Sequence, residues 1–216
     1  MVPRFFSFTF LVLSRYGAKP AKADVHYNAA MSKHDNLYLV GLMGAGKTTV
    51  GRLLAKHYGC SFFDSDHEIE AHTGVKIPVI FEIEGEAGFR KREEAAIAEL
   101  TALSGVVLAT GGGAVLSPNN RDRLRKNGVV IYLRGTPEHL HERTRHDRGR
   151  PLLQTVDPLG RLRELYTQRD PLYREVADIV MDTGRQSVSS MMRVLIGKID
   201  AFVSGLAQTE SGHEPG

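Results

Sequence analysis

The segment that most constrains the fold of this chain is Gly41-Leu-Met-Gly-Ala-Gly-Lys47-Thr48. Its glycines let the backbone curl so that consecutive N–H groups point at one anion, where side chains would block the approach. An apolar stretch, Asn36–Val40, precedes the segment. Apolar residues recur at helical spacing after it, at Val50, Leu53, Leu54 and Tyr58. A glycine-rich loop between a strand and a helix N-terminus, ending in lysine and threonine, predicts a nucleotide phosphate site.

The last residues of this loop have distinct expected roles. Lys47 can reach the β- and γ-phosphates of a nucleotide, and the Thr48 hydroxyl is placed to bind Mg²⁺. A glycine-rich turn with a chance lysine is the alternative, but it does not explain why strand, loop and helix signals agree. The predicted nucleotide-binding residues of this segment are Gly44, Ala45, Gly46, Lys47, Thr48 and Thr49.

Strand-like and helix-like segments alternate along the chain from Asn36 onwards. The predicted strands are 36–40, 61–64, 106–109, 129–133 and 179–182. The clearest helices after the first are 86–103 and an apolar stripe from Val188 to Phe202. This alternation favours a parallel sheet with helices on both faces. We therefore expect an α/β fold, a three-layer sandwich around a five-stranded parallel sheet.

A single domain is expected over residues 36–205, flanked by two segments of different character. Residues 1–35 contain a short apolar run, Phe5–Leu13, which is too short to span a bilayer and lacks a clear cleavage pattern. We interpret 1–35 as a disordered extension. Met31 is a possible natural start, and a targeting segment is the minor alternative. Residues 206–216 have few apolar side chains and are expected to form a flexible tail.

The formal charge of +3 does not indicate a polyanionic partner. Residues 1–35 hold five of the 28 basic and two of the 25 acidic residues, which leaves 23 of each in the rest. A neutral domain has no electrostatic footprint for a nucleic acid. The single cysteine, Cys60, excludes an intrachain disulfide and fits a reducing compartment. We expect a cytoplasmic monomer with neither nucleic-acid nor membrane partners.

The phosphate loop alone indicates nucleotide binding but not an activity. The sequence has no Asn-Lys-x-Asp motif, which GTP switch proteins use to read guanine, and no strand ending in Asp-Glu, which is usual in ATPase motors. For a chain of 216 residues, a small-molecule or nucleotide kinase is the natural class.

Two carboxylates, Asp64 and Asp66, follow the second predicted strand. Ligands gather at the carboxyl ends of parallel strands, and residues i and i+2 of an extended segment point the same way. One aspartate can hold Mg²⁺ through water while the other contacts an acceptor hydroxyl. In the alternative interpretation, Asp66 caps the helix that follows, which leaves the other aspartate without a role.

Taken in order, these motifs and several further ones resemble the shikimate kinase family. The further motifs are Phe63-Asp-Ser-Asp-His-Glu-Ile-Glu70, Thr73-Gly74, Gly88-Phe-Arg90, Thr110-Gly-Gly-Gly113, Arg150-Pro-Leu-Leu153 and Arg169-Asp-Pro-Leu-Tyr173. The resemblance extends from Asn36 to Phe202. It implies the P-loop fold of nucleoside monophosphate kinases. It also implies ATP-dependent phosphorylation of the shikimate 3-hydroxyl, a step towards chorismate and the aromatic amino acids.

The resemblance implies an acceptor site made of Asp66, Arg90, Gly112 and Arg169. Arg90 and Arg169 would bind the shikimate carboxylate, since a guanidinium offers a fork of donors. Asp66 would orient the reacting hydroxyl, and whether it also takes the proton stays open. Glycines after the third strand suit close approach of substrate at Gly112, and a tight turn explains them equally well.

The resemblance also implies a mobile lid at about residues 143–157. Arg150 from this lid would meet the transferring phosphoryl group, so the predicted catalytic residues are Lys47, Asp66 and Arg150. Arg143 and Gln186 would contact adenine, with Arg185 as the alternative to Gln186. ATP is the implied co-substrate. One Mg²⁺ per subunit would be bound directly by Thr48 and through water by Asp64.

Two other functions are compatible with the phosphate loop. One is another small kinase, acting on gluconate or a nucleoside monophosphate, although a nucleotide acceptor would need a base-reading site. The other is a non-catalytic protein that kept the fold. Such degenerate proteins tend to lose the acceptor or lid arginines, which this sequence retains at positions 90, 150 and 169.

Overall fold

The structure is a computed structural model that describes residues 36–145, 151–184 and 186–211. Its five strands are β1 (Leu37–Val40), β2 (Ser61–Asp64), β3 (Val106–Ala109), β4 (Val129–Arg134) and β5 (Ile179–Asp182). All neighbouring strands are parallel, in the order β2-β3-β1-β4-β5. The predicted five-stranded parallel sheet is therefore confirmed.

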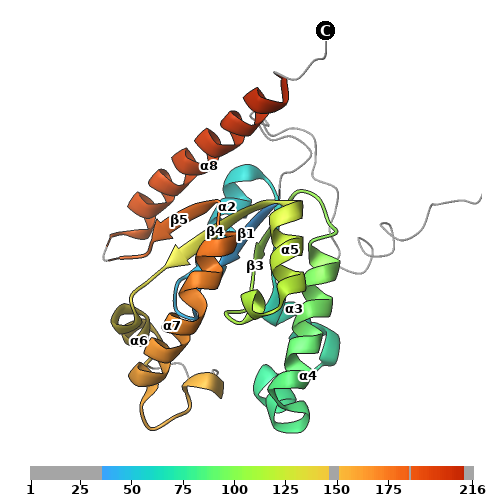
Figure 1. Ribbon diagram of the computed structural model, residues 1–216, viewed down its shortest axis with the longest axis vertical. Coiled ribbons are helices and arrows are strands. Elements are labelled where there is room, and N and C mark those ends of the chain that lie inside the picture. Colours follow the sequence, from blue (N-terminus) through green and yellow to red (C-terminus); the bar gives the residue numbers. More distant parts are fainter. Residues whose placement is uncertain (1–35, 146–150, 185, 212–216) are drawn as a thin grey trace, which may run out of the picture.

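Helices cover both faces of this sheet. They are α2 (Lys47–Tyr58), α3 (Ser65–Thr73), α4 (Ile77–Leu100), α5 (Pro118–Asn127), α6 (Pro137–Thr144), α7 (Pro158–Val176) and α8 (Val188–Ser211), with short 3₁₀ turns η1 (Ala114–Leu116) and η2 (Pro151–Leu153). Helices α2 and α8 lie on one face and α5 and α7 on the other (Figure 1). The arrangement is the expected three-layer sandwich.

The central strand β1 is buried along its whole length, with every side chain 0% exposed. It is apolar without alternation because helices cover both of its faces. Leu37 lies opposite Val107 of β3 and Val129 of β4, so the three strands run in register. Their carboxyl ends, and the loops that follow them, therefore open at the same edge of the sheet.

Helices α3 and α4 form a second, smaller apolar cluster beside the main core, with Ile69, Ile80, Phe89 and Ala96 buried in it. Gly85 breaks α4 with φ 68° and ψ −177°, a conformation that side-chain-bearing residues avoid. The helix predicted at 86–103 corresponds to the part of α4 after this break, which ends at Leu100. The preceding part, from Ile77, was not predicted.

The structure describes only part of the segments predicted to flank the domain. Helix α8 continues to Ser211, beyond the boundary at residue 205 that the loss of apolar residues indicated. The extension predicted at residues 1–35 and the end of the predicted tail, 212–216, lie outside the described residues. Within the described ranges, no helix is long and apolar enough to cross a membrane.

We expect Gly51→Ala to destabilise the fold. Gly51 is buried in α2, and an added Cβ would lie 2.5 Å from Phe62 Cε2 and 3.0 Å from Leu39 Cδ1. Overpacking of this kind costs about 1–3 kcal/mol, more than the gain in helix propensity of up to about 1 kcal/mol. Urea unfolding measures the change in free energy.

Gly197→Ala is the matched control, because Gly197 is an exposed interior residue of α8. No described heavy atom outside its own helix backbone and chain neighbours lies within 4 Å of an added Cβ there. This variant should be as stable as the wild type or more stable. Equal stability of the two variants would contradict the packing argument.

Candidate functional site

A cleft of about 710 Å³ opens at the carboxyl edge of the sheet. Its lining comes from the loop after β1, the end of β2, the turn after β3, the 3₁₀ turn η2, and helices α2, α3, α4, α6 and α7. The predicted site residues that line it are Gly44, Gly46, Lys47, Thr48, Thr49, Asp64, Asp66, Arg90, Gly112, Arg143 and Arg169. Residues widely separated in the sequence thus meet in one cavity.

The loop after β1 has the geometry of an anion site. Gly44 and Gly46 adopt positive φ of 79° and 94°, which glycine accepts at little cost. Gly46 occupies the N-cap position of α2 and has no side chain to cap the helix. The first N–H groups of α2 therefore point into the cleft with the positive end of the helix dipole.

Lys47 begins α2, and its ammonium is held over the loop that it follows. Nζ donates to the carbonyl of Gly41 at 2.7 Å and to that of Leu42 at 3.0 Å. Ala45 differs from its neighbours, because it is 1% exposed and its N–H donates to Leu42 O. Ala45 thus stabilises the loop from its buried side, and it is not part of the cleft lining.

Thr48 and Asp64 meet at the boundary between the loop and β2. Thr48 Oγ1 donates to Asp64 Oδ2 at 2.7 Å, so a hydroxyl and a carboxylate lie side by side. Hard oxygen atoms of this kind suit Mg²⁺, which usually keeps several waters and phosphate ligands. No cluster of three or more His, Cys, Asp or Glu suited to a metal occurs in the described part of the chain. The pair fits a metal that arrives with a nucleotide.

Asp64, rather than Asp66, caps helix α3. Its Oδ1 accepts the N–H of Asp66 at 3.2 Å, and α3 begins at Ser65. The capping interpretation of Asp66 was therefore wrong, because the helix starts two residues earlier than that interpretation required. Asp66 lies instead in the first turn, where it lines the cleft with Oδ1 buried. An acid in the first turn also suits the helix dipole.

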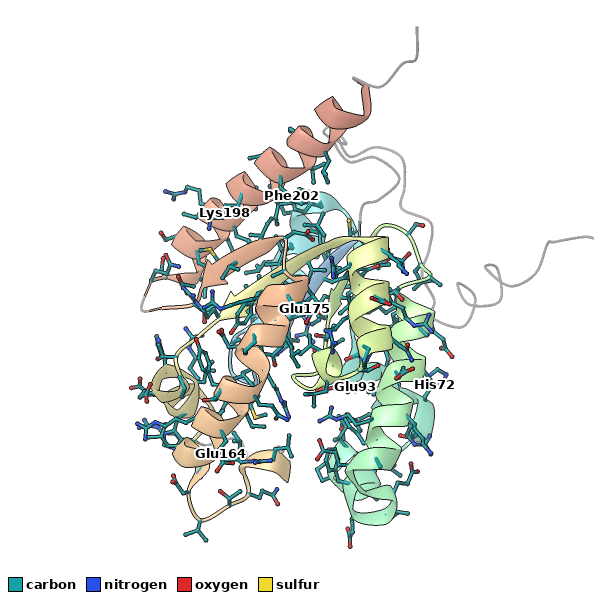
Figure 2. All side chains as sticks on the ribbon, in the orientation of Figure 1. His72, Glu93, Glu164, Glu175, Lys198 and Phe202 are labelled. Carbon is teal, nitrogen blue, oxygen red and sulfur yellow. The ribbon has the colours of Figure 1, made fainter. Side chains whose placement is uncertain are left out.

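Arg90 is held by two carboxylates of its own helix. Its Nη1 donates to Glu93 Oε2 at 2.7 Å and its Nη2 to Glu86 Oε1 at 2.8 Å. Glu93 is 1% exposed and points from α4 towards the centre of the molecule (Figure 2). Burial raises the pKa of Glu93 above its usual range, and the Arg90 charge offsets part of that effect. The ion pair keeps Arg90 at the wall of the cleft.

Arg169 is a buried cation on α7, only 2% exposed. Its Nε and Nη1 have no hydrogen-bond partner within the described residues. Burial lowers the pKa of this guanidinium, which nevertheless stays protonated at neutral pH. A buried donor without a partner costs free energy, so a group that lines a cleft in this state is prepared for an anion.

The glycines of the turn after β3 have different structural reasons. A Cβ at Gly111 would meet Glu93 Oε1 and, at 2.6 Å, Asp66 Oδ1, and one at Gly113 would collide with the Arg90 guanidinium. A Cβ at Gly112 would find only ordinary contacts, the nearest at 3.6 Å. All three glycines line the cleft. A side chain at 111 or 113 would displace the charged groups of Asp66, Glu93 or Arg90, whereas position 112 has room.

Two residues that support this turn were not among the predicted site residues. Ser65 Oγ accepts the N–H of Gly111 at 2.8 Å, and the Tyr173 hydroxyl donates to the Gly112 carbonyl at 2.5 Å. Tyr173 stands four residues after Arg169, on the same face of α7. That spacing, and the place of Tyr173 at the end of the motif Arg169-Asp-Pro-Leu-Tyr173, are sequence signals that could have drawn attention to it.

The residues expected around adenine are only partly brought together. Arg143 of α6 donates to Gly44 O at 3.4 Å and to Gly184 O at 3.5 Å, so it bridges the phosphate loop and the loop after β5. Gln186 is exposed, donates to Asp182 O at 3.0 Å and does not line the cleft. Arg150 and Arg185, with lid residues 146–150, lie outside the described residues.

Several known proteins with similar sequences and structures are shikimate kinases. The family model described as shikimate kinase matches residues 43–200. A shikimate kinase of Thiobacillus denitrificans is 80% identical over 170 residues, which is 79% of this chain and 93% of the relative. One of Cupriavidus pinatubonensis is 62% identical over 76% of this chain and 86% of its own length. A solved shikimate kinase from Acinetobacter baumannii in complex with shikimate is 50% identical, with a TM-score of 0.75, and the match covers 76% of this chain and 92% of that one.

We expect Arg90→Met to destabilise the protein most at high pH. Without Arg90, the buried carboxylate of Glu93 loses the charge that opposes its desolvation, and its pKa rises further. A carboxyl group with a raised folded-state pKa contributes stability below its unfolded pKa and loses it as pH rises. Removing one partner of a buried pair costs about 3–5 kcal/mol, so urea unfolding should show this loss at pH 8 and a smaller one at pH 5.

The double variant Arg90→Met/Glu93→Gln controls for lost packing around Arg90. The glutamine introduced in place of Glu93 carries no charge at either pH, so the extra loss at pH 8 should disappear. If the single variant loses the same free energy of unfolding at the two pH values, the loss does not arise from the ionisation of Glu93.

Proposed function

The chain belongs to the shikimate kinase family, and we propose that the cleft at the carboxyl edge of its sheet transfers the γ-phosphoryl group of ATP to the 3-hydroxyl of shikimate. The protein is an ATP-dependent phosphotransferase of the shikimate pathway. We also propose a role for each site residue, one bound metal ion, an oligomeric state and a location in the cell.

The observation that carries the residue assignments is Arg169, a buried guanidinium with two nitrogens that lack partners among the described residues. Shikimate is a cyclic triol with one carboxylate, and a carboxylate is the anion that a guanidinium binds with the best geometry. Arg90 lies at the wall of the same cleft, and Gly112 leaves room for substrate beside Arg169 Nη1. These three residues bind the carboxylate end of shikimate.

The nucleotide occupies the other end of the cleft. The backbone N–H groups of Gly44 and Gly46–Thr49 and the positive end of α2 hold the phosphates, and Lys47 exchanges its loop carbonyls for phosphate oxygens. We assign two residues to the adenine side: Arg143, which lines the cleft, and Gln186, which lies outside the cleft lining in the structure. Arg150 of the lid approaches the transferring group, where a cation stabilises charge on the equatorial oxygens.

Thr48 would hold one Mg²⁺ per subunit directly and Asp64 would hold it through water, consistent with the oxygen pair that these side chains form. When bound, the ion neutralises charge on the β- and γ-phosphates. Asp64 keeps a second task, since its other oxygen caps α3 and thereby fixes the start of the helix that carries Asp66.

Asp66 positions the reacting hydroxyl. Its buried Oδ1 lies beside Gly111, next to Glu93, in a part of the cleft that is shielded from water. A carboxylate there accepts the hydrogen bond of an incoming hydroxyl and aims its oxygen at the phosphoryl group. With Lys47 and Arg150 neutralising the phosphates, in-line transfer requires little further chemistry from the protein.

We further propose that the enzyme acts as a cytoplasmic monomer. ATP is a cytoplasmic metabolite, and residues 36–216 carry equal numbers of acidic and basic side chains. The same charge balance supports the absence of a nucleic-acid partner.

An assay that couples ADP release to NADH oxidation tests the acceptor. Shikimate, gluconate and AMP are compared at equal concentration with ATP and Mg²⁺, and ADP release should depend on shikimate alone. ADP release that requires gluconate or AMP instead would assign the cleft to a different small kinase.

Asp66→Asn should abolish most turnover and leave nucleotide binding intact. Loss of a positioned acid–base group costs about 10²- to 10⁴-fold in kcat. The phosphate loop, to which Asp66 does not belong, sets the affinity for ATP. The coupled assay gives kcat, and calorimetric titration with ATP gives the Kd.

Glu68→Gln is the control for Asp66→Asn, because Glu68 is a second carboxylate of α3 that lines the cleft. It should retain kcat within about threefold, as expected for a charge without a direct contact. Near-wild-type turnover of Asp66→Asn would remove Asp66 from the mechanism.

Arg169→Ala should chiefly raise the KM for shikimate. A hydrogen-bonded ion pair with a charged partner contributes about 1.5–3 kcal/mol, which corresponds to roughly 10- to 150-fold in KM. The KM for ATP should stay nearly constant. Arg163→Ala removes an exposed arginine of the same helix and should change neither value. An unchanged shikimate KM in Arg169→Ala would contradict the carboxylate assignment.

A further inference from the structure

The turn Gly111–Gly113 has no side chains of its own, so other elements must fix its backbone. Its N-terminal end is fixed by Ser65 of α3, which accepts the Gly111 N–H. Its C-terminal end packs against the Arg90 guanidinium of α4 at Gly113. Backbone N–H groups of η1 occupy the carbonyls of Gly111 and Gly113, at 3.1 and 2.9 Å. The Gly112 carbonyl, in the middle of the turn, receives no such hydrogen bond from η1.

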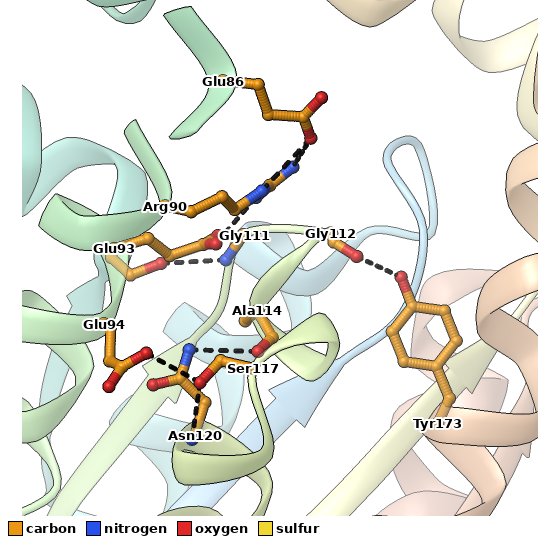
Figure 3. A network of polar contacts seen from close by, with 11 residues as sticks. Glu86, Arg90, Glu93, Glu94, Gly111, Gly112, Ala114, Ser117, Asn120 and Tyr173 are labelled. Atoms are coloured by element: carbon orange, nitrogen blue, oxygen red, sulfur yellow. Dashed lines mark hydrogen bonds and ion pairs between the residues drawn. The ribbon is translucent and has the colours of Figure 1, made fainter. Parts of the chain in front are cut away.

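Tyr173 supplies the partner for that carbonyl. Its hydroxyl donates to Gly112 O at 2.5 Å, the contact drawn between α7 and the turn in Figure 3. Tyr173 is 1% exposed, and burial raises the pKa of its phenol against the opposing effect of Arg169. The hydroxyl therefore remains protonated at neutral pH and acts as a donor.

The Tyr173 ring is itself held in place from the sheet. It stacks on Tyr132 of β4, with ring centroids 4.9 Å apart and planes inclined by 30°. The Tyr132 hydroxyl donates away from the turn, to Asp170 Oδ1 at 2.8 Å. The stacking fixes the position of the Tyr173 ring. The Tyr173 hydroxyl is therefore held within hydrogen-bond distance of Gly112 O.

The position of Tyr173 also connects the turn with Arg169. The two residues are one helical turn apart on α7, and the charge of Arg169 opposes the rise in the pKa of the Tyr173 phenol. A Cβ at Gly112 would lie 3.8 Å from Arg169 Nη1, so the fixed peptide and the guanidinium border the same space. Any rotation of the Gly112 carbonyl would change the shape of the cleft next to Arg169.

We propose that Tyr173 is a positioning residue of the acceptor site: its hydroxyl locks the Gly112 peptide beside Arg169, so that shikimate meets a preformed surface. The inference rests on the proposed role of this end of the cleft in shikimate binding. Without the hydroxyl, three successive glycines leave the turn free to adopt other backbone conformations, and binding must select the competent one. The affinity for shikimate falls accordingly, while the phosphate loop is unaffected.

Tyr173→Phe and Tyr132→Phe form a matched pair for the test. Each removes one hydroxyl of the stacked pair and keeps both rings, but only the first loses the contact with Gly112. Tyr173→Phe should raise the shikimate KM and calorimetric Kd by about 3- to 10-fold, the range of one hydrogen bond, with the KM for ATP within twofold. Tyr132→Phe should leave both shikimate constants within twofold. Thermal unfolding is measured for both, because a merely structural role would lower Tm without a selective effect on shikimate.

The outcomes separate this inference from the proposed function. If wild-type enzyme releases no ADP with shikimate, the proposed function fails. If wild-type enzyme is active and Tyr173→Phe binds shikimate normally, or if Tyr132→Phe weakens binding equally, the positioning role is overturned. Should Tyr173→Phe not fold, Ser65→Ala carries the test, because it removes the Gly111 anchor. An unchanged shikimate KM in Ser65→Ala would overturn the dependence of affinity on a fixed turn.

Discussion

The parallel pairing of β1 with β3 on one side and β4 on the other is the constraint on which the rest of the structure depends. It places Leu37 opposite Val107 and Val129, so Gly41 and Thr110 follow neighbouring strands at the same edge. Thr110 continues the ladder, donating its N–H to Leu39 O at 3.0 Å. Backbone hydrogen bonds between the central strands thus set the distance between the phosphate loop and the turn of three glycines.

Two cations of the cleft differ in how their charge is compensated. Arg90 is paired with Glu86 and Glu93, so its geometry is set before any ligand arrives. Arg169 retains nitrogens that no described group satisfies. One arginine therefore has its hydrogen bonds made within the protein, and the other does not. Together they give the site both a defined shape and a preference for an anion. The first arginine forms the wall, and the second supplies donors whose hydrogen bonds a carboxylate can complete.

The order and type of most elements could be predicted from sequence, because periodicity and loop chemistry are local signals. The strands 61–64, 106–109 and 179–182 agree with the structure at both ends. The break at Gly85 could not be predicted, since a glycine within a helical pattern does not reveal its φ. Similarly, Asp64 rather than Asp66 caps α3 because β2 ends directly in the helix. The role of Tyr173 depends on a contact across 61 positions of the chain, which spacing alone does not disclose.

The ammonium of Lys47 has a consequence for how its variants should be interpreted. It donates to two carbonyls of the loop that precedes it, and so helps to keep that loop folded while phosphate is absent. A substitution at position 47 therefore removes a ligand contact and an internal clamp together. Its effect on ATP affinity combines the lost attraction between ammonium and phosphate with the free energy needed to reorder a relaxed loop. Comparing the order of the loop in the unliganded variant and the unliganded wild type separates the two contributions.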